Sequence, residues 1–281
     1  MPAGVKIPTR DLLNGTPPAT RVRTFGDKVH ELLVADNEEK MAKHIPSGKV
    51  SGGKLSRPLL WNVLSLIGVP DPIDPYLLGK FVRGNDVEDR AIKFLTGIDA
   101  SAVEDNTPVE AEPGNVLAGT FTFQKPGSYR GGVGYIDMAQ EVGGMTVYHE
   151  IKSVTKMAYD RVDKEDQPYY HHAIQLAYYC LGDNVSEAYL QYLNADDYRI
   201  TSFKINPLEY KEEIDKEIDD LKTVFITKKL PPFVALLDMH KVKRYRQYED
   251  WNWLTPDQMM DKLQNQFPEQ YKRFMEMTID D

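Results

Sequence analysis

The strongest constraint on the fold of this chain is a pair of β-rich segments joined by two glycines. Residues 133–139 and 145–154 alternate apolar with polar side chains or are rich in β-forming residues, as strands of a half-buried sheet are. Gly143 and Gly144 lie between them and suit the two-residue turn of a β-hairpin. The sequence therefore predicts an antiparallel hairpin in the middle of the chain.

The turn also predicts which residues of the two strands stand opposite each other. It places Val142 opposite Met145, and counting outward along both strands places Asp137 opposite Glu150. Lys152 follows Glu150 by two residues, so its side chain points to the same face of the sheet. Two carboxylates and one ammonium group are therefore expected on one patch of the sheet.

Opposed carboxylates on a sheet repel each other, and a divalent cation between them would remove that repulsion. Mg²⁺ takes oxygen ligands, typically one or two carboxylates with waters and phosphate oxygens, and the backbone carbonyl of Ile151 can add one more. Lys152 would orient or help to deprotonate the attacking water, or neutralise charge on the phosphoryl group. The pattern predicts metal-dependent phosphodiester hydrolysis; the alternative is an exposed, purely structural ion pair between Glu150 and Lys152.

The rest of the chain indicates one α/β domain with helical additions at both ends, because no internal repeat or low-complexity tract divides it. A helix is expected from Ser56 as N-cap, with Pro58 in its first turn, to Gly68. Other helices are expected over 25–43, 85–95, 167–181, 207–227 and 255–277, and other strands over 116–123, 188–193 and 199–205. The expected parts are an irregular arm (1–24), a helical extension (25–83), a core (84–230) and a basic aromatic segment with a terminal helix (231–281).

Composition excludes several classes of protein. The chain of 281 residues is 41% hydrophobic, and its 43 acidic against 34 basic residues give a net charge of −9, which disfavours wrapping of nucleic acid by bulk charge. Cys180 is the one cysteine, so an intrachain disulfide and a zinc or iron–sulfur site built from cysteines are excluded. No signal-peptide or membrane-spanning run is found, so an intracellular, cytoplasmic location and no membrane partner are expected.

The pattern Gly-Tyr-Ile-Asp137 followed by His-Glu150-Ile-Lys152 resembles that of the PD-(D/E)XK nuclease superfamily, and more closely its RecB-like, phage lambda-type exonuclease branch. The resemblance covers residues 84–204. It implies a restriction-endonuclease-like core, with a mixed sheet of about five strands flanked by helices. It also implies that Glu88, four residues after Gly84, is an additional metal-facing acid.

The same resemblance implies that Gln175 and Tyr179 belong to the catalytic set. Residues four apart share one face of a helix, so this pair can present an amide and a phenol to the site; the alternative is that both simply pack in the core. His171 and His172 are expected to have a surface or capping role.

The chain also departs from the family pattern. Ile136 stands where the family has proline, and the four cysteines that hold an iron–sulfur cluster in some members are absent, so that cofactor is not expected. Asp86 and Asp89 compete with Glu88 for the metal-facing position.

Binding to DNA is expected to depend mainly on phosphate contacts, because no recognition module is evident. Trp251 and Trp253 can stack on unpaired bases or pack in the core. The basic stretch near residue 241 is equally consistent with a solvated loop. The candidate contacts are Lys49, Lys54, Arg57, Lys125, Arg130, Lys241, Lys243, Arg244 and Arg246.

The sequence thus predicts a Mg²⁺-dependent DNA exonuclease, with Mn²⁺ able to substitute, that has little sequence specificity and acts in recombination, repair or phage DNA metabolism. Its expected partner is DNA with a free end, with a second copy of the chain or a recombination protein as further possibilities. The alternatives are a structure-specific endonuclease of the same fold and a noncatalytic nucleic-acid-binding protein.

Overall fold

The computed structural model describes residues 31–37, 39, 47–70, 75–111, 113–234 and 248–279. The chain divides into two units, residues 1–43 and residues 44–281. Within the first unit, residues 31–37 are helical, inside the range where a helix is expected. The following paragraphs concern the second unit.

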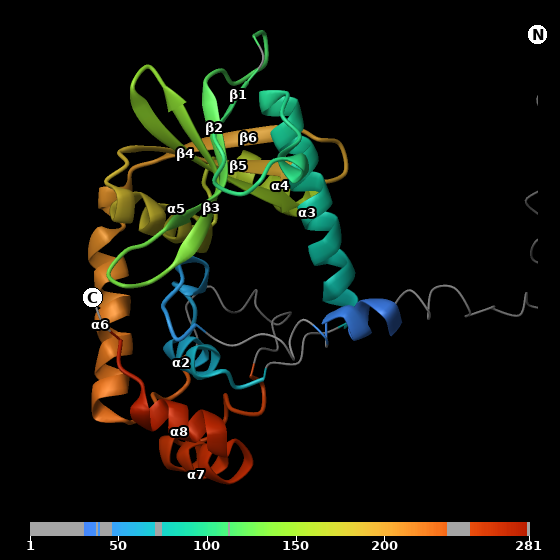
Figure 1. Cartoon of the computed structure of the whole chain (residues 1–281). Coiled ribbons are helices and arrows are strands. Elements are labelled where there is room, and N and C mark those ends of the chain that lie inside the picture. Colours follow the sequence, from blue (N-terminus) through green and yellow to red (C-terminus); the bar gives the residue numbers. More distant parts are fainter. Residues whose placement is uncertain are drawn as a thin grey trace, which may run out of the picture. The chain divides into compact units, whose positions relative to one another are not determined.

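A six-stranded mixed sheet forms the centre of this unit (Figure 1). Its strands are hydrogen-bonded in the order of the chain, and all neighbours are antiparallel except β4 and β5, which run parallel. The mixed sheet of the predicted α/β fold is confirmed, with one short strand more than expected. The strands are β1 (Val109–Glu110), β2 (Thr120–Gly127), β3 (Gly134–Val142), β4 (Met145–Val154), β5 (Glu187–Asn194) and β6 (Ile200–Ile205).

The parallel connection from β4 to β5 contains two helices, α4 (Lys156–Glu165) and α5 (Tyr170–Asp183). The sequence predicted one helix over 167–181, which matches α5 and misses α4. Helix α4 is mostly polar, and Tyr159 and Val162 are its buried residues. Its apolar period is therefore too weak to be recognised in the sequence.

The remaining helices lie before and after the six strands in the chain. Ser56 is not the N-cap that the sequence predicted: Pro58 holds that position, and Ser56 has a left-handed backbone with φ of 58°. Gly68 ends the helix as expected, and Pro268 divides the expected terminal helix in two. These elements are η1 (Gly52–Lys54), α2 (Leu59–Ile67), α3 (Pro75–Thr96), η2 (Ala100–Ala102), η3 (Pro207–Glu209), α6 (Lys211–Thr227), α7 (Pro256–Gln266) and α8 (Pro268–Glu276).

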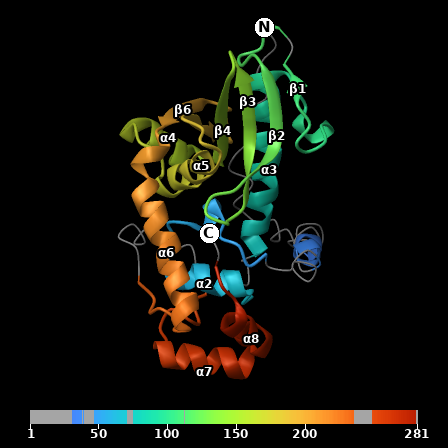
Figure 2. The ribbon, with the colours of Figure 1, turned by 60° about the vertical axis from the view of Figure 1, so that its left-hand side comes forward.

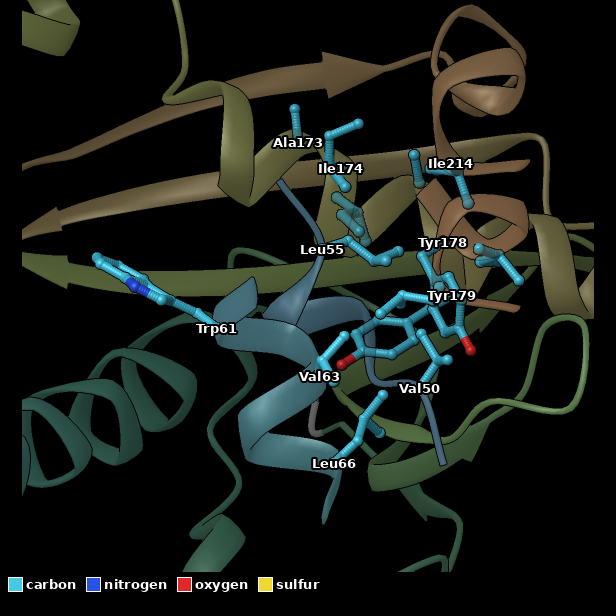
Figure 3. Packing of buried hydrophobic residues seen from close by; sticks show 14 of the residues in the cluster. Val50, Leu55, Trp61, Val63, Leu66, Ala173, Ile174, Tyr178, Tyr179 and Ile214 are labelled. Carbon is cyan, nitrogen blue, oxygen red and sulfur yellow. The ribbon is translucent and has the colours of Figure 1, made fainter. Parts of the chain in front are cut away.

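Two hydrophobic clusters cover the two faces of the sheet, with α5 on one side and α3 on the other (Figure 2). The larger cluster joins α2, α5 and α6 to the sheet, and Figure 3 shows Leu55, Val63 and Ile214 packing near Tyr178 and Tyr179. The smaller cluster packs α3 against β2, β3 and β4. Both helices are thereby held next to the central hairpin, which carries the candidate site.

Candidate active site

The central hairpin has the turn and the register that the sequence predicted. Gly143 and Gly144 have φ angles of 59° and 80°, the left-handed values that a tight hairpin turn requires. Pairing of β3 with β4 continues outward from the turn to Met138 opposite His149, in the register that leads next to Asp137 and Glu150.

At Asp137 a side chain rather than the backbone joins the two strands. Its Oδ2 accepts a hydrogen bond from the backbone N–H of Ile151 at 2.9 Å, which holds the carboxylate against β4. Burial raises the pKa of Asp137, while the charge of Lys152 and the bond from Ile151 oppose the rise. The hydrogen bond from Ile151 therefore fixes the carboxylate in place.

Glu150 is the most deeply buried acid of the site, with a side chain 1% exposed. Its Oε1 accepts hydrogen bonds from Lys152 Nζ at 2.5 Å and from Gln175 Nε2 at 2.7 Å, whereas its Oε2 has no partner among the described residues. Burial, with the nearby charge of Asp137, raises the pKa of Glu150 to about 8. A buried carboxylate oxygen without a partner is energetically costly, and a cation is one way to satisfy it.

Lys152 is surrounded by acids. Burial alone would lower its pKa, but the charges of Glu150 and Asp137 and the bond to Glu150 raise it above the ordinary value for lysine. The side chain therefore stays protonated at neutral pH. Of the roles expected for this residue, charge neutralisation and orientation of a water fit the structure better than proton abstraction.

Glu88 on α3 reaches the same strand from the other side. Its Oε1 accepts a hydrogen bond from the backbone N–H of Ser153 at 3.0 Å, and burial, with the charge of Asp137, raises its pKa to about 7. The competing acids Asp86 and Asp89 are exposed. The structure thus brings Glu88, rather than either neighbour, to the hairpin.

Helix α5 brings Gln175 and Tyr179 to the hairpin. Gln175 reaches Glu150, as described above. Tyr179 is buried against β3 so closely that a Cβ on Gly134 would lie 2.3 Å from its ring. Burial, with the charge of Glu150, raises the pKa of Tyr179, so its phenol stays protonated.

Sequence reasoning did not place η1 at the site. A Cβ on Gly53 would lie 3.7 Å from the Gln175 side-chain amide, so this turn lies against the helix that binds Glu150. The pair Gly52-Gly53 was the one available signal, since adjacent glycines permit close approach of a backbone.

The donor set suits a hard divalent cation. Asp137, Glu150 and Glu88 offer carboxylate oxygens, and the Ile151 carbonyl stays an expected ligand. Among the described residues, no group of three or more His, Cys, Asp or Glu side chains lies close enough together to hold a metal ion. Because Mg²⁺ commonly takes one or two carboxylates and completes its shell with water and substrate oxygens, Asp137 and the unpartnered Oε2 of Glu150 suffice.

The candidate DNA contacts divide into three groups. Lys49 and Arg57 are exposed, whereas Lys54 donates to Ser65 Oγ at 2.6 Å. Lys125 and Arg130 lie in ion pairs away from the carboxylates, Lys125 with Asp183 at 3.4 Å and Arg130 with Asp215 and Asp219 at 3.4 and 2.6 Å. The basic stretch Lys241, Lys243, Arg244 and Arg246 lies outside the described residues.

The two tryptophans differ in exposure. Trp251 is buried and packs against Phe267, with ring centroids 5.7 Å apart. Trp253 is 83% exposed, so its ring is accessible for stacking on an unpaired base. Separately, no helix in the described part of the chain is long and apolar enough to cross a membrane.

Comparison with known proteins finds similarity at the level of structure. No protein-family model matches the chain, and no curated protein matches it in sequence. The crystal structure of SSO0001 is 15% identical, with 70% of this chain and 86% of that chain covered and a TM-score of 0.42. An alkaline exonuclease (LHK-Exo) from Laribacter hongkongensis is 14% identical, with 66% and 93% covered and a TM-score of 0.41; its complex with dAMP gives 15%, the same coverage and 0.40.

No residue role in this chain rests on those similarities. The order of the strands, the acidic hairpin and the helices on both faces of the sheet agree with the PD-(D/E)XK nuclease-like fold expected from the sequence.

Proposed function

We propose that this protein is a metal-dependent DNA nuclease that hydrolyses phosphodiester bonds from DNA ends with little sequence preference. One observation carries the proposal: Asp137, Glu150 and Glu88 gather around Lys152, and the buried Oε2 of Glu150 has no partner among the described residues. Three acids beside one ammonium group cost stability when they are ionised, and a bound cation would offset that cost.

Each residue of the candidate site has a separate role in the proposed reaction. Asp137 and Glu150, with Glu88 and the Ile151 carbonyl, would hold Mg²⁺ or Mn²⁺, which when bound would lower the pKa of a water and polarise the scissile phosphate. Lys152 would neutralise charge that develops on the phosphoryl oxygens. Gln175 holds Glu150 through Oε1.

Tyr179 has a different contribution. Its phenol stays protonated and can donate a hydrogen bond. Its tight packing against β3 also keeps α5, and with it Gln175, in register with the hairpin.

An assay on end-labelled linear, nicked and covalently closed DNA, with Mg²⁺, Mn²⁺ or EDTA, tests this function. We expect linear DNA to be degraded only with metal, and Asp137→Asn, Glu150→Gln and Lys152→Ala each to abolish the activity. The exposed Asp261→Asn on α7 is the matched control and should act like the unchanged protein. Cutting of closed circles at the same rate would replace the exonuclease by an endonuclease. No cleavage with either metal, together with no metal binding, would indicate a noncatalytic nucleic-acid-binding protein.

A further inference from the structure

Beside the carboxylates, a short chain of hydrogen bonds fixes the proton of one histidine. The backbone N–H of Tyr169 donates to the hydroxyl of Tyr192 at 2.9 Å, and that hydroxyl lies 2.9 Å from Nδ1 of His172. Tyr192 is fully buried, so its own proton must go to an acceptor. Nδ1 of His172 is the acceptor that the geometry offers, and a neutral His172 then carries its proton on Nε2, as a donor.

His172 belongs to a group of nitrogen-bearing side chains at the start of α5. The ring of His171 lies 4.0 Å from that of His172, centroid to centroid. The charges of Arg57 and Lys152 reach both rings and add to the effect of burial in lowering the pKa of each, for His171 to about 4. Both rings are therefore neutral near pH 7, and the charges that act on them are positive.

This group also lies next to the candidate active site. His171 precedes Gln175 by four residues, so the two side chains share one face of α5, and Gln175 contacts Glu150. His171 and Arg57 are both exposed in part. The face of α5 that carries His171 is therefore open to solvent close to the residue that binds Glu150.

We infer that His171, His172 and Arg57 form a subsite for a backbone phosphate of the nucleic acid strand, next to the phosphodiester that is cleaved. A phosphate oxygen accepts hydrogen bonds from imidazole N–H groups, and the guanidinium of Arg57 can bind it in a bidentate manner. The orienting bond from Tyr192 makes His172 a donor before the ligand arrives, so no rearrangement is needed. These three are positioning residues: they bind a phosphate that does not react, and so they bind it equally in the substrate and in the transition state.

The inference rests on the proposed nuclease function, and its test separates the two. Fluorescence anisotropy in EDTA measures the affinity of the full chain for a labelled oligodeoxynucleotide and for the same oligomer with neutral methylphosphonate linkages. His171→Ala, His172→Ala and Arg57→Ala should each weaken binding of the phosphodiester probe about tenfold, the range for loss of a charge-assisted hydrogen bond. Their affinity for the neutral probe should fall less, because a methylphosphonate group keeps one acceptor oxygen but carries no charge. Lys272→Ala, an exposed cation on α8, is the control and should leave both affinities unchanged.

Tyr192→Phe gives a second route if His172→Ala does not fold. It keeps the ring in the core and removes only the hydroxyl that orients His172, and it should weaken binding of the phosphodiester probe more than binding of the neutral probe. With Mg²⁺, all four variants should raise KM and leave kcat nearly unchanged, because they remove binding common to substrate and transition state.

Each outcome decides between the two proposals. Folded variants with unchanged affinity and unchanged KM would overturn the subsite while leaving nuclease activity in place. An unchanged protein that binds neither probe would also overturn it. Loss of phosphodiester binding in the variants of a protein that cleaves nothing would support the subsite and refute the nuclease.

Discussion

The position of Asp137 favours the binding of a cation more than it favours the stability of the fold. Its carboxylate is bonded to the N–H of Ile151, yet burial raises its pKa, so the charged form is disfavoured in the folded chain. Asn at this position keeps an acceptor for Ile151 and removes the charge. We therefore expect Asp137→Asn to abolish cleavage and, without metal, to leave the free energy of unfolding unchanged or raise it by about 1 kcal/mol.

Chemical denaturation in EDTA, beside the cleavage assay, measures both effects. Asp261→Asn should change neither. A loss of more than about 2 kcal/mol in the free energy of unfolding of Asp137→Asn would mean that the residue has a structural role. It would contradict the view that the charge at this position serves cation binding and lowers stability.

Glu88 is one of three acids within one turn of α3, and the structure distinguishes it from the other two. Glu88 reaches the hairpin through the N–H of Ser153, whereas Asp86 and Asp89 are exposed. Glu88→Gln should therefore lower kcat/KM by at least tenfold, the loss of about 1.4 kcal/mol of transition-state stabilisation. Asp86→Asn and Asp89→Asn should stay within twofold of the unchanged protein. A larger loss in either aspartate variant than in Glu88→Gln would reassign the position.

The residues of the site were predictable from sequence to different degrees. Asp137 and Glu150 were predicted together because a two-residue glycine turn fixes the register of a hairpin, and the paired residues confirm that register. Glu88 precedes the buried residues Ala91 and Ile92 by three and four positions, so helical spacing favours it over its neighbours; its hydrogen bond to Ser153, 65 residues away, is not contained in any local pattern. The orientation of His172 depends on Tyr192, twenty residues later on another element, and no local pattern contains that information.

At the scale of elements, the position of α5 depends on how closely it approaches the loop before β3. A Cβ on Gly182 would lie 2.0 Å from the backbone carbonyl oxygen of Ser128, whereas a Cβ on Gly84 in α3 would meet no atom within 4 Å. Gly182→Ala should therefore lower the free energy of unfolding by about 2–3 kcal/mol. Gly84→Ala should raise it by up to about 1 kcal/mol, because alanine is the better helix former.

Thermal or urea unfolding of both variants measures these changes. Gly182→Ala should also lower cleavage more than its stability alone explains, because a shifted α5 carries Gln175 away from Glu150. Equal stability of the two variants would show that the loop near Ser128 moves freely and that α5 is positioned by other contacts.

Glu217 on α6 makes the link between this helix and the segment before α2 dependent on pH. Its Oε2 accepts from the N–H of Ser56 at 2.7 Å, and burial, with the charges of Glu213 and Asp220, raises its pKa from 4.5 to about 7. A raised acid pKa means that the protonated form is favoured in the folded state. The stability that Glu217 contributes is thus complete below pH 4.5 and is lost as pH rises through 7.

Glu217→Gln imitates the protonated form at every pH. It should equal the unchanged protein in stability near pH 4 and exceed it by about 1–2 kcal/mol at pH 8, after allowance for solvent screening of a partly exposed group. Urea unfolding between pH 4 and 8 measures the difference, with the exposed Glu212→Gln on the same helix as control. Parallel stability profiles for the two proteins would contradict the assigned pKa.

Elements with a clear apolar period were predictable, and elements defined by long-range packing were not. The hairpin strands, α5 and the two strands after it lie close to their predicted ranges. Helix α4 was missed because Tyr159 and Val162 are its buried residues, and Ser56 was taken for a cap because its N–H partner, Glu217, lies 161 residues away.

At the scale of the whole molecule, the net charge of −9 bears on how DNA can be bound at all. The site itself holds three acids, Glu88, Asp137 and Glu150, whose ionised forms repel an incoming phosphate until a cation neutralises them. Lys125 and Arg130 are engaged in ion pairs with acids of the chain. These two cations are therefore already paired within the chain, and affinity should depend on the metal.

We expect DNA to bind weakly in EDTA and at least tenfold more tightly with Ca²⁺, a hard cation with the same preference for oxygen ligands. The plot of log affinity against log salt concentration should be shallow, with a slope of about −2 to −4, because each neutralised phosphate contributes about −0.9. Glu150→Gln should lose the Ca²⁺-dependent part of the affinity and keep the rest, since it removes the negative charge of the ligand and no basic side chain. Tight binding in EDTA with a slope steeper than about −6 would contradict this, because so many phosphate contacts would hold the DNA without the metal.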